Sequence, residues 1–221
     1  MNVLYQDEYL IVCVKPSGVL SQGDEKGRKN MPSLLSGTLG CEIFPVHRLD
    51  FEVAGVMVYA KTQTVAAKLS ALVSCHEQFR KEYLAVVEGN PDEDEAVLED
   101  LLFHDVKRNK SFVADKKRRG VKEARLSYRV IGTTETEEGT RSLVRIRLYT
   151  GRTHQIRVQF ASRGMPLVGD RRYGAQKTEY GIALCSCHLS FRHPMTGRQV
   201  VCEHYPDTLT SFSELEVKSK N

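Results

Sequence analysis

The sequence predicts an α+β fold built on a mixed, mostly antiparallel sheet. Short apolar runs rich in β-branched residues recur along the chain, only a few segments have helical periodicity, and most connections are short. A doubly wound parallel sheet would need a long crossover between neighbouring strands, and this pattern is absent. With 221 residues, 41% of them hydrophobic, the chain is long enough to bury one sizeable core.

The first half predicts two strands and two helices. Strands are expected over 9–14 and 56–60, where the apolar runs end at turn-forming or polar residues. Between them, up to about residue 40, a glycine-containing surface excursion carries a short helix near Ser33. Thr62 is placed to cap a second helix, whose apolar face would hold four residues: Val65, Leu69, Leu72 and Val73.

The second half predicts further strands and one more helix. A strand over 83–87 ends at the Gly-Asn-Pro sequence that follows it, and 124–131 pairs with 142–149 as a hairpin around the polar turn 132–139. Thr153 is expected to cap a helix that runs through about Ser162. The last two strands flank a hairpin turn over 193–197.

Alternation along the run 142–149 predicts a half-exposed strand. Arg145, Arg147 and Tyr149 share one face, and Val144, Ile146 and Leu148 share the other. The two arginines are therefore expected to be accessible to a ligand.

Charge is strongly segregated, although the formal net charge is only +4. Residues 92–100 hold six acids and no base, whereas 107–122 hold eight bases and one acid. The basic segment, which includes Lys116, Lys117, Arg118 and Arg119, is typical of phosphate-binding surfaces, and equally of a solvated loop that resists aggregation.

No signal sequence or membrane span is predicted. Met1–Val14 carries two acids and lacks a cleavage site, and no apolar run reaches the roughly 20 residues needed to cross a bilayer. Six scattered cysteines indicate reduced thiols, and hence a cytoplasmic protein. Cys185, Cys187 and Cys202 lack paired Cys-x-x-Cys spacing, so we expect buried thiols and no metal.

Candidate chemistry begins at the tetrapeptide 47–50, His-Arg-Leu-Asp, ahead of a predicted strand. Alone, an Asp beside Arg and His is typical of a structural ion pair. Together with other segments it resembles the signature of the RluA-type family of RNA pseudouridine synthases. Those segments, in the order of the family, are Lys-Pro-Ser-Gly at 15–18, Ala-Gly at 54–55, Ala-Lys-Thr at 60–62, Lys-Glu-Tyr-Leu-Ala at 81–85, Gly89, Gly-Arg-Thr-His-Gln-Ile-Arg at 151–157, Gly-Asp-Arg-Arg-Tyr-Gly at 169–174 and Phe-Arg-His-Pro-Met-Thr-Gly at 191–197.

The resemblance implies a pseudouridine synthase fold and three catalytic residues. Asp50 would be the catalytic aspartate, Tyr83 the aromatic residue against the target base, and Arg152 the partner of the Asp50 carboxylate. The residue types suit these roles, because a carboxylate can act as a nucleophile and a guanidinium keeps a neighbouring carboxylate charged. Attack on the ribose and its deprotonation by the same carboxylate both stay open. Each of two residues also has an alternative interpretation without a catalytic role. Tyr83 would then be a buried aromatic residue of a strand, and Arg152 would only contact a phosphate.

The resemblance also implies structured ribosomal or transfer RNA as the partner, without a cofactor. Arg48 resembles the family residue that fills the stack vacated by a flipped nucleotide, and its other reading is a salt bridge. His47, Arg48, Lys116, Lys117, Arg118, Arg119, Arg145 and Arg147 form the predicted substrate-binding set. Departures from the family pattern include Val53-Ala54 for Thr-Ser, Val14 for Asn, and Gln159 and Cys185 for His, and they bear on the RNA target.

The domain expectation is a single catalytic domain over 1–221, with its core at about 5–205 and a flexible tail at 214–221. It is expected to be monomeric and to recognise RNA without an N-terminal accessory module. Two other functions stay open: a catalytically silent RNA-binding relative, which would lack product, and a nucleoside hydrolase or glycosidase. The second usually needs a pair of carboxylates, and no second acid accompanies Asp50 in these segments.

Overall fold

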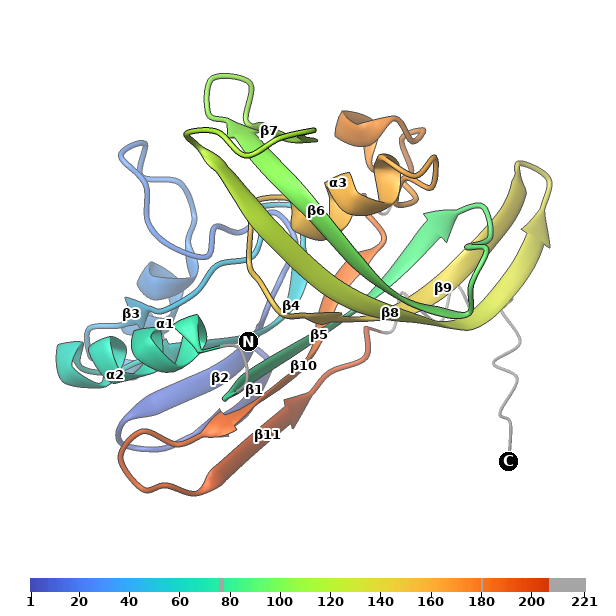
Figure 1. The fold of residues 1–221 in the computed structure, drawn as a ribbon. Coiled ribbons are helices and arrows are strands. Elements are labelled where there is room, and N and C mark those ends of the chain that lie inside the picture. Colours follow the sequence, from blue (N-terminus) through green and yellow to red (C-terminus); the bar gives the residue numbers. More distant parts are fainter. Residues whose placement is uncertain (76–77, 180, 207–221) are drawn as a thin grey trace. The chain divides into compact units, whose positions relative to one another are not determined.

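The computed structural model describes residues 1–75, 78–179 and 181–206 and has the predicted α+β fold (Figure 1). The chain divides into two compact units. Met1–Lys81 and Cys185–Pro206 form the first unit, and Glu82–Leu184 belong to the second. The tail predicted at 214–221 lies outside the described residues. No helix within the described ranges is long and apolar enough to cross a membrane.

The first unit is built on strands that pair in the order β1, β2, β4, β10. β11 extends this order beside β10, and β3 also pairs with β4. β4 and β10 run parallel, whereas the other pairs of this unit are antiparallel. The bounds are β1 Val3–Gln6, β2 Leu10–Lys15, β3 Phe44–Pro45, β4 Ala54–Ala60, β10 Leu184–Arg192 and β11 Gln199–Glu203.

Two helices of the first unit begin at side-chain caps. α1 (Met31–Leu39) follows Asn30, whose Oδ1 accepts a hydrogen bond from the Ser33 amide at 2.9 Å. α2 (Gln63–Ser74) follows the predicted cap Thr62, whose hydroxyl oxygen accepts from the Val65 amide at 3.3 Å. The core of this unit packs apolar side chains of β2, β4 and β10 against α2; its members include Leu10, Val12, Val56, Val58, Leu69 and Phe191.

The second unit pairs its strands in the order β5, β9, β8, β6, β7. Figure 1 shows β8 and β9 as a long curved hairpin, and the short helix α3 packs against β6 and β7. The bounds are β5 Phe79–Glu88, β6 Glu95–Asp105, β7 Lys110–Val113, β8 Val121–Thr136, β9 Gly139–Leu148, α3 Gln155–Ala161 and the 3₁₀ turn η1 Arg171–Tyr173. β5 begins at Phe79 in the first unit and continues into the second.

Most predicted elements are confirmed, but several features differ. β1 and β3 were not predicted, and the turn predicted over 132–139 is too long, because β8 continues to Thr136 and pairs there with the start of β9 at Gly139. The sequence pattern predicts neither β6 nor β7, yet the acidic run 92–100 supplies most of β6. Two of its acids pair with arginines of β8: Glu95 with Arg129 at 2.5 Å and Glu99 with Arg125 at 3.1 Å. The strand therefore carries cross-strand ion pairs in place of the apolar alternation by which a strand is recognised in a sequence.

The expected cap Thr153 is wrong. α3 instead begins after His154, which has a left-handed backbone (φ 55°) and makes no side-chain capping bond. The Thr153 carbonyl accepts a hydrogen bond from the Ser111 hydroxyl at 2.6 Å, which ties it to β7.

Candidate active site

Asp50 lies in a tight turn that leads into β4. The Val53 amide donates to the Asp50 carbonyl at 3.1 Å, which closes the turn around Phe51 and Glu52. Leu49 and Val53 on either side are buried at 6% and 2% exposure, whereas the Asp50 side chain is half-buried. The two apolar residues anchor the turn in the core and leave the carboxylate at its edge.

The backbone of this turn is held by the segment that follows β2. The Gly18 amide donates to the Phe51 carbonyl at 2.9 Å, and the Ser17 hydroxyl donates to the Glu52 carbonyl at 2.8 Å. Ser21 is bonded twice to Leu49, donating to its carbonyl at 2.8 Å and accepting from its amide at 2.9 Å. Asp50 therefore sits between two clamped residues.

Lys15 reinforces the same turn from inside the protein. Its ammonium donates to the carbonyls of Val19 at 2.7 Å, Pro16 at 2.9 Å and Phe51 at 3.4 Å, and the residue is fully buried. Burial lowers the pKa of Lys15 to about 8, and the Asp50 carboxylate acts in the opposite direction. Lys15 thus interacts electrostatically with Asp50 as a buried positive charge, and it donates three hydrogen bonds to backbone carbonyls of the loop and the turn.

His47 and Arg48 differ sharply in their surroundings. The His47 ring packs edge-on against Phe79, and its Nε2 accepts a hydrogen bond from the Val58 amide at 3.2 Å. Burial, with a smaller effect of Lys81, lowers the pKa of His47 to about 3, so the ring is neutral and orders β4. Arg48 is exposed. Of these two predicted contacts, only Arg48 has an open side chain.

Gly55 allows the strand after Asp50 to approach β10 closely. Its φ is 129°, and a Cβ at this position would lie 2.3 Å from the Ser186 carbonyl oxygen and 2.5 Å from the Ser186 nitrogen. Such contacts exclude every other residue type. The close approach of the two backbones therefore explains the glycine in the Ala-Gly sequence at 54–55. This packing fixes the position of β4 and of the turn before it.

In the second unit, Tyr83 lies on β5 and is 7% exposed. Next to it in sequence, Glu82 is buried and accepts a hydrogen bond from Arg145 Nε of β9 at 2.6 Å. Arg147 places its guanidinium 5.0 Å from the centroid of the Tyr149 ring. The alternation predicted for β9 is confirmed, since Val144, Ile146 and Leu148 are buried while Arg145 and Arg147 are half-buried.

The loop that carries Arg152 is fixed by Gln155. Gln155 Oε1 accepts from the Thr150 hydroxyl at 2.7 Å and from the Arg152 amide at 3.0 Å, while its Nε2 donates to the Arg125 carbonyl at 3.1 Å. Arg152 itself donates through Nε to the Glu123 carbonyl at 2.8 Å. The buried amide of Gln155 thus holds the backbone from which the Arg152 guanidinium extends.

A buried polar cluster supports the other side of this loop. The Tyr173 hydroxyl accepts from the Ser111 amide at 2.8 Å and lies 3.0 Å from His154 Nδ1. Arg157 and Asp170, both almost completely buried, form two hydrogen bonds of 2.6 and 2.8 Å, and the guanidinium lies 5.3 Å from the Tyr173 ring centroid. The blocks at 151–157 and 169–174 therefore meet in one structural network.

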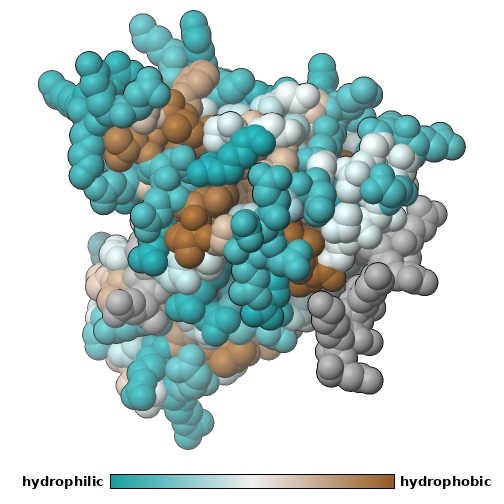
Figure 2. Space-filling view, turned by 45° about the vertical axis from the view of Figure 1, so that its right-hand side comes forward, coloured by the Kyte–Doolittle hydropathy of each residue, from teal (hydrophilic) through white to brown (hydrophobic). Residues whose placement is uncertain are grey.

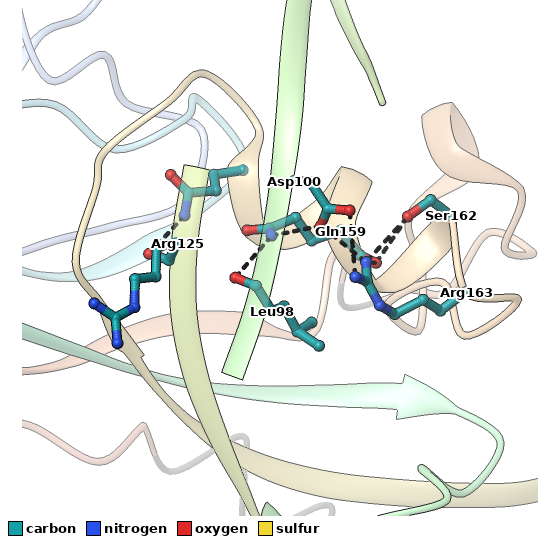
Figure 3. Close-up of polar contacts among 7 residues, drawn as sticks. Leu98, Asp100, Arg125, Gln159, Ser162 and Arg163 are labelled. Carbon is teal, nitrogen blue, oxygen red and sulfur yellow. Dashed lines mark hydrogen bonds and ion pairs between the residues drawn. The ribbon is translucent and has the colours of Figure 1, made fainter. Parts of the chain in front are cut away.

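Gln159 connects α3 with β6 (Figure 3). Its Nε2 donates to Asp100 Oδ2 at 2.7 Å and to the Leu98 carbonyl at 3.3 Å, and Arg163 donates to the same carboxylate at 2.9 Å. Gln159 Oε1 is buried without a hydrogen-bond partner among the described residues. This amide orientation is the favourable one, because the reverse would aim Oε1 at the Asp100 carboxylate. Gln159 therefore anchors α3, and with it the end of the loop that carries Arg152.

The basic segment 107–122 occupies the β6–β7 turn, β7, and the loop into β8. Lys116, Lys117, Arg118 and Arg119 are all exposed. Lys117 pairs with Glu123, and Arg118 lies 5.6 Å from the Phe103 ring centroid. Figure 2 shows one face of the molecule. Hydrophilic residues cover most of this face, and hydrophobic residues are exposed on it in separate patches.

The expected buried thiols are confirmed. All six cysteines are free, and Cys185, Cys187 and Cys202 are buried on β10 and β11. Burial raises the pKa of Cys185 to about 12 and of Cys202 to about 11, so neither is a reactive thiolate at neutral pH. Among the described residues, no group of three or more His, Cys, Asp or Glu is arranged to hold a metal ion.

Comparison with known proteins agrees with these features. The family model described as RNA pseudouridylate synthase matches residues 9–162. An RNA pseudouridine synthase of Aquifex aeolicus is 34% identical over 99% of this chain and 74% of that protein. A ribosomal large subunit pseudouridine synthase D of Zymomonas mobilis is 32% identical over 100% and 74%. A tRNA pseudouridine synthase C of Vibrio parahaemolyticus is 29% identical over 91% and 88%.

Solved structures show the same fold. Human RNA pseudouridylate synthase domain containing 1 has a TM-score of 0.78 at 20% identity, covering 95% of this chain and 85% of that one. Human RNA pseudouridylate synthase domain containing 4 also has a TM-score of 0.78, at 21% identity, covering 100% and 95%. Fold and ordered blocks together define an isomerase that acts on RNA. The chain belongs to the RNA pseudouridylate synthase family, RluA type, and is a pseudouridine synthase.

The predicted site residues fall on both units. His47, Arg48 and Asp50 lie in the first, and Tyr83, Arg152, Arg145, Arg147 and Lys116–Arg119 lie in the second. The pairing of Asp50 with Arg152 and the approach of Tyr83 to Asp50 would join the units, and both stay predictions.

Sequence reasoning missed the supporting roles of Lys15, Ser21 and Gln155. Lys15 lies in the family segment 15–18 and Gln155 in the segment 151–157, and their place in these segments could have indicated a role in the site. Ser21 gives no signal in the sequence.

Proposed function

We propose that this enzyme isomerises a specific uridine to pseudouridine in structured ribosomal or transfer RNA, with Asp50 as the nucleophile. The observation that carries the proposal is the clamped turn, which holds the Asp50 backbone while its carboxylate stays half-buried at the edge of the core. The relatives support this RNA class, because one is named a ribosomal large subunit pseudouridine synthase and another a tRNA pseudouridine synthase.

The chemistry requires one bond to be exchanged for another. The bond from ribose C1′ to uracil N1 breaks and a bond from C1′ to ring carbon five forms. Carbon five therefore loses a proton and N1 gains one, while the detached base is kept in place. Asp50 would act on the ribose, either by attack or by deprotonation. Arg152 would keep the carboxylate charged through a planar, bidentate contact, and Tyr83 would lie against the base and assist removal of the ring proton.

The target uridine would be flipped out of its stack, at a cost of a few kcal/mol. Arg48, exposed two residues before Asp50, would fill the vacated space. The exposed run Lys116–Arg119, with Arg145 and Arg147, would contact phosphates in a salt-dependent manner. We assign His47 to positioning, because its Nε2 is occupied by the Val58 amide.

We further propose that residues 1–221 act as a single catalytic domain, as a cytoplasmic monomer and without a cofactor. The six free cysteines fit a reducing compartment.

The decisive experiment maps pseudouridines by chemical labelling in ribosomal and transfer RNA from cells with and without this protein. A site that disappears with the protein, and returns when the wild-type gene is restored, identifies the substrate. Restoration with Asp50→Asn should not return it, although RNA binding should remain. Glu52→Gln, which removes a carboxylate from the same turn, is the control and should restore the site.

Three outcomes would contradict the proposal. Full modification by Asp50→Asn would remove Asp50 from catalysis. RNA binding without any lost site would indicate a silent relative, and release of free uracil would indicate a hydrolase.

A further inference from the structure

The ring of Phe51 is exposed directly beside the proposed nucleophile. Phe51 is 44% exposed, although phenylalanine is among the residue types most often buried. It follows Asp50 in the chain and occupies the first corner of the Asp50–Val53 turn. A ring at this point is presented to whatever RNA segment surrounds the target uridine.

The backbone at Phe51 is fixed, although its side chain is exposed. Phe51 stands at a corner of the turn, and Leu49 and Val53 on either side of it are buried. The Phe51 carbonyl is fixed by the Gly18 amide at 2.9 Å and by the Lys15 ammonium at 3.4 Å. Because the backbone is already fixed and a phenylalanine side chain has only two rotatable bonds, ordering this ring on binding costs little conformational entropy, which favours its use as a contact surface.

A cationic side chain lies over one face of this ring. The Arg28 guanidinium carbon is 5.8 Å from the Phe51 centroid, and Arg28 Nε is held by Asp24 Oδ2 at 2.6 Å. Lys26 and Lys29 of the same loop are exposed, as is Arg48 on the other side of Asp50. An aromatic face bordered by cations is the arrangement that proteins use to stack an RNA base and to contact its phosphate.

We propose that Phe51, with Arg28 over one face of its ring, stacks through the other face on an unpaired nucleotide next to the target uridine. The proposal rests on the proposed function, because it takes Asp50 to mark the place of the target. A paired base in a helix has both faces covered by its neighbours, so only a base in a loop, bulge or end can stack on a side chain. The substrate class is thereby narrowed to uridines with at least one unpaired neighbour.

The test compares Phe51→Leu, which removes the ring and keeps an apolar side chain, with Phe51→Tyr, which keeps the ring. Tyr205→Leu is the matched control, because it removes another exposed aromatic ring of the same unit. The probe is ribosomal and transfer RNA purified from cells that lack the protein. Phe51→Leu should lower kcat/KM by about 5- to 150-fold, mainly through KM, which corresponds to about 1–3 kcal/mol for one stacked base. Phe51→Tyr and Tyr205→Leu should stay near wild type.

A synthetic stem-loop copied from a mapped site gives a second reading. An abasic residue beside the target should slow the wild-type enzyme by the same factor and should add nothing to Phe51→Leu. Losses that multiply would show that ring and base act separately and would overturn the proposal, as would modified uridines flanked by base pairs on both sides.

Binding separates this proposal from the proposed function. In an Asp50→Asn background, Phe51→Leu should weaken the affinity for the same purified RNA by at least about 5-fold. If wild type forms no pseudouridine but affinity falls as expected, the proposed function fails and the stacking surface stands. If affinity is unchanged, or if the protein binds no RNA, the stacking surface is overturned.

Discussion

Replacing Lys15 by methionine tests whether a buried ammonium holds the Asp50 turn in its reactive geometry. Methionine keeps the length and apolar stem of the side chain, but it removes the donor to the Pro16, Val19 and Phe51 carbonyls. Since the Gly18 amide still satisfies Phe51, the main loss falls on Pro16 and Val19. Hydrogen bonds from a charged donor contribute about 1.5–3 kcal/mol each, so roughly 3–6 kcal/mol is lost.

Relief from burying the charge offsets much of this loss. The lowering of the Lys15 pKa from 10.5 to about 8 corresponds to about 3 kcal/mol of burial cost. The free energy of unfolding should therefore fall by no more than about 3 kcal/mol, whereas kcat should fall by about 10- to 100-fold, because a small displacement of the reactive carboxylate is enough for that loss. Guanidinium denaturation and single-turnover pseudouridine formation measure the two quantities.

Lys81→Met is the matched control. Lys81 is also buried with its pKa lowered to about 8, but the contact described for its ammonium is the Phe79 ring at 5.6 Å. This variant should gain the same relief without releasing the turn. Wild-type kcat in Lys15→Met would refute the reasoning, because the turn would then keep its geometry without the ammonium.

Three further outcomes are expected. Replacing Lys116, Lys117, Arg118 and Arg119 by Ala should weaken RNA binding and flatten the slope of log K against log salt, by about 0.7–0.9 for each phosphate contact removed; an unaltered slope in filter binding would make the segment a bystander. Because burial lowers the pKa of Lys15 and Lys81 to about 8, the unfolded chain binds more protons than the folded one above that pH. Each lysine should then add about 1 kcal/mol of stability from pH 8 to 9, whereas Cys185 and Cys202, whose pKa burial raises, act in the opposite direction. Lys15→Met with Lys81→Met should remove the lysine contribution in denaturant titrations. Gly55→Ala should lower the free energy of unfolding by more than about 3 kcal/mol in thermal melts. Gly27→Ala is the control: its φ is 64° and the space around its Cβ is open, so it should lower the free energy of unfolding by only about 1 kcal/mol. Similar melting of the two variants would contradict the close approach of Gly55 to Ser186.

The predictable part of the fold is the part in which local pattern and tertiary packing agree. β2, β4 and α2 carry apolar runs and a Thr62 cap, and each formed near its expected bounds. β6 was unpredictable because its acids Glu99 and Glu95 pair with Arg125 and Arg129 on β8, which lie 26 and 34 positions further along the chain. Thr153 failed as a cap because its backbone is used by Ser111 of β7.

The site divides in the same way. Asp50, Tyr83 and Arg152 are predicted as site residues from ordered blocks, since a reactive residue type stands out within them, and their roles stay predictions. The groups that hold them did not stand out. Lys15 acts through carbonyls, and Gln155 acts through three backbone or hydroxyl partners, none of which leaves a pattern of side-chain types.

The way the chain passes between the two units has a consequence for folding during synthesis. The chain leaves the first unit within β5 and returns to it within β10, so about a hundred residues separate Lys81 from Cys185. On the ribosome, β4 cannot pair with its parallel neighbour until the residues around Cys185 have emerged, and until then its edge stays unpaired and its apolar side chains are not fully covered. Strand pairs between distant parts of a chain form slowly and leave aggregation-prone edges exposed. The nascent protein should therefore depend on chaperones more than its size suggests.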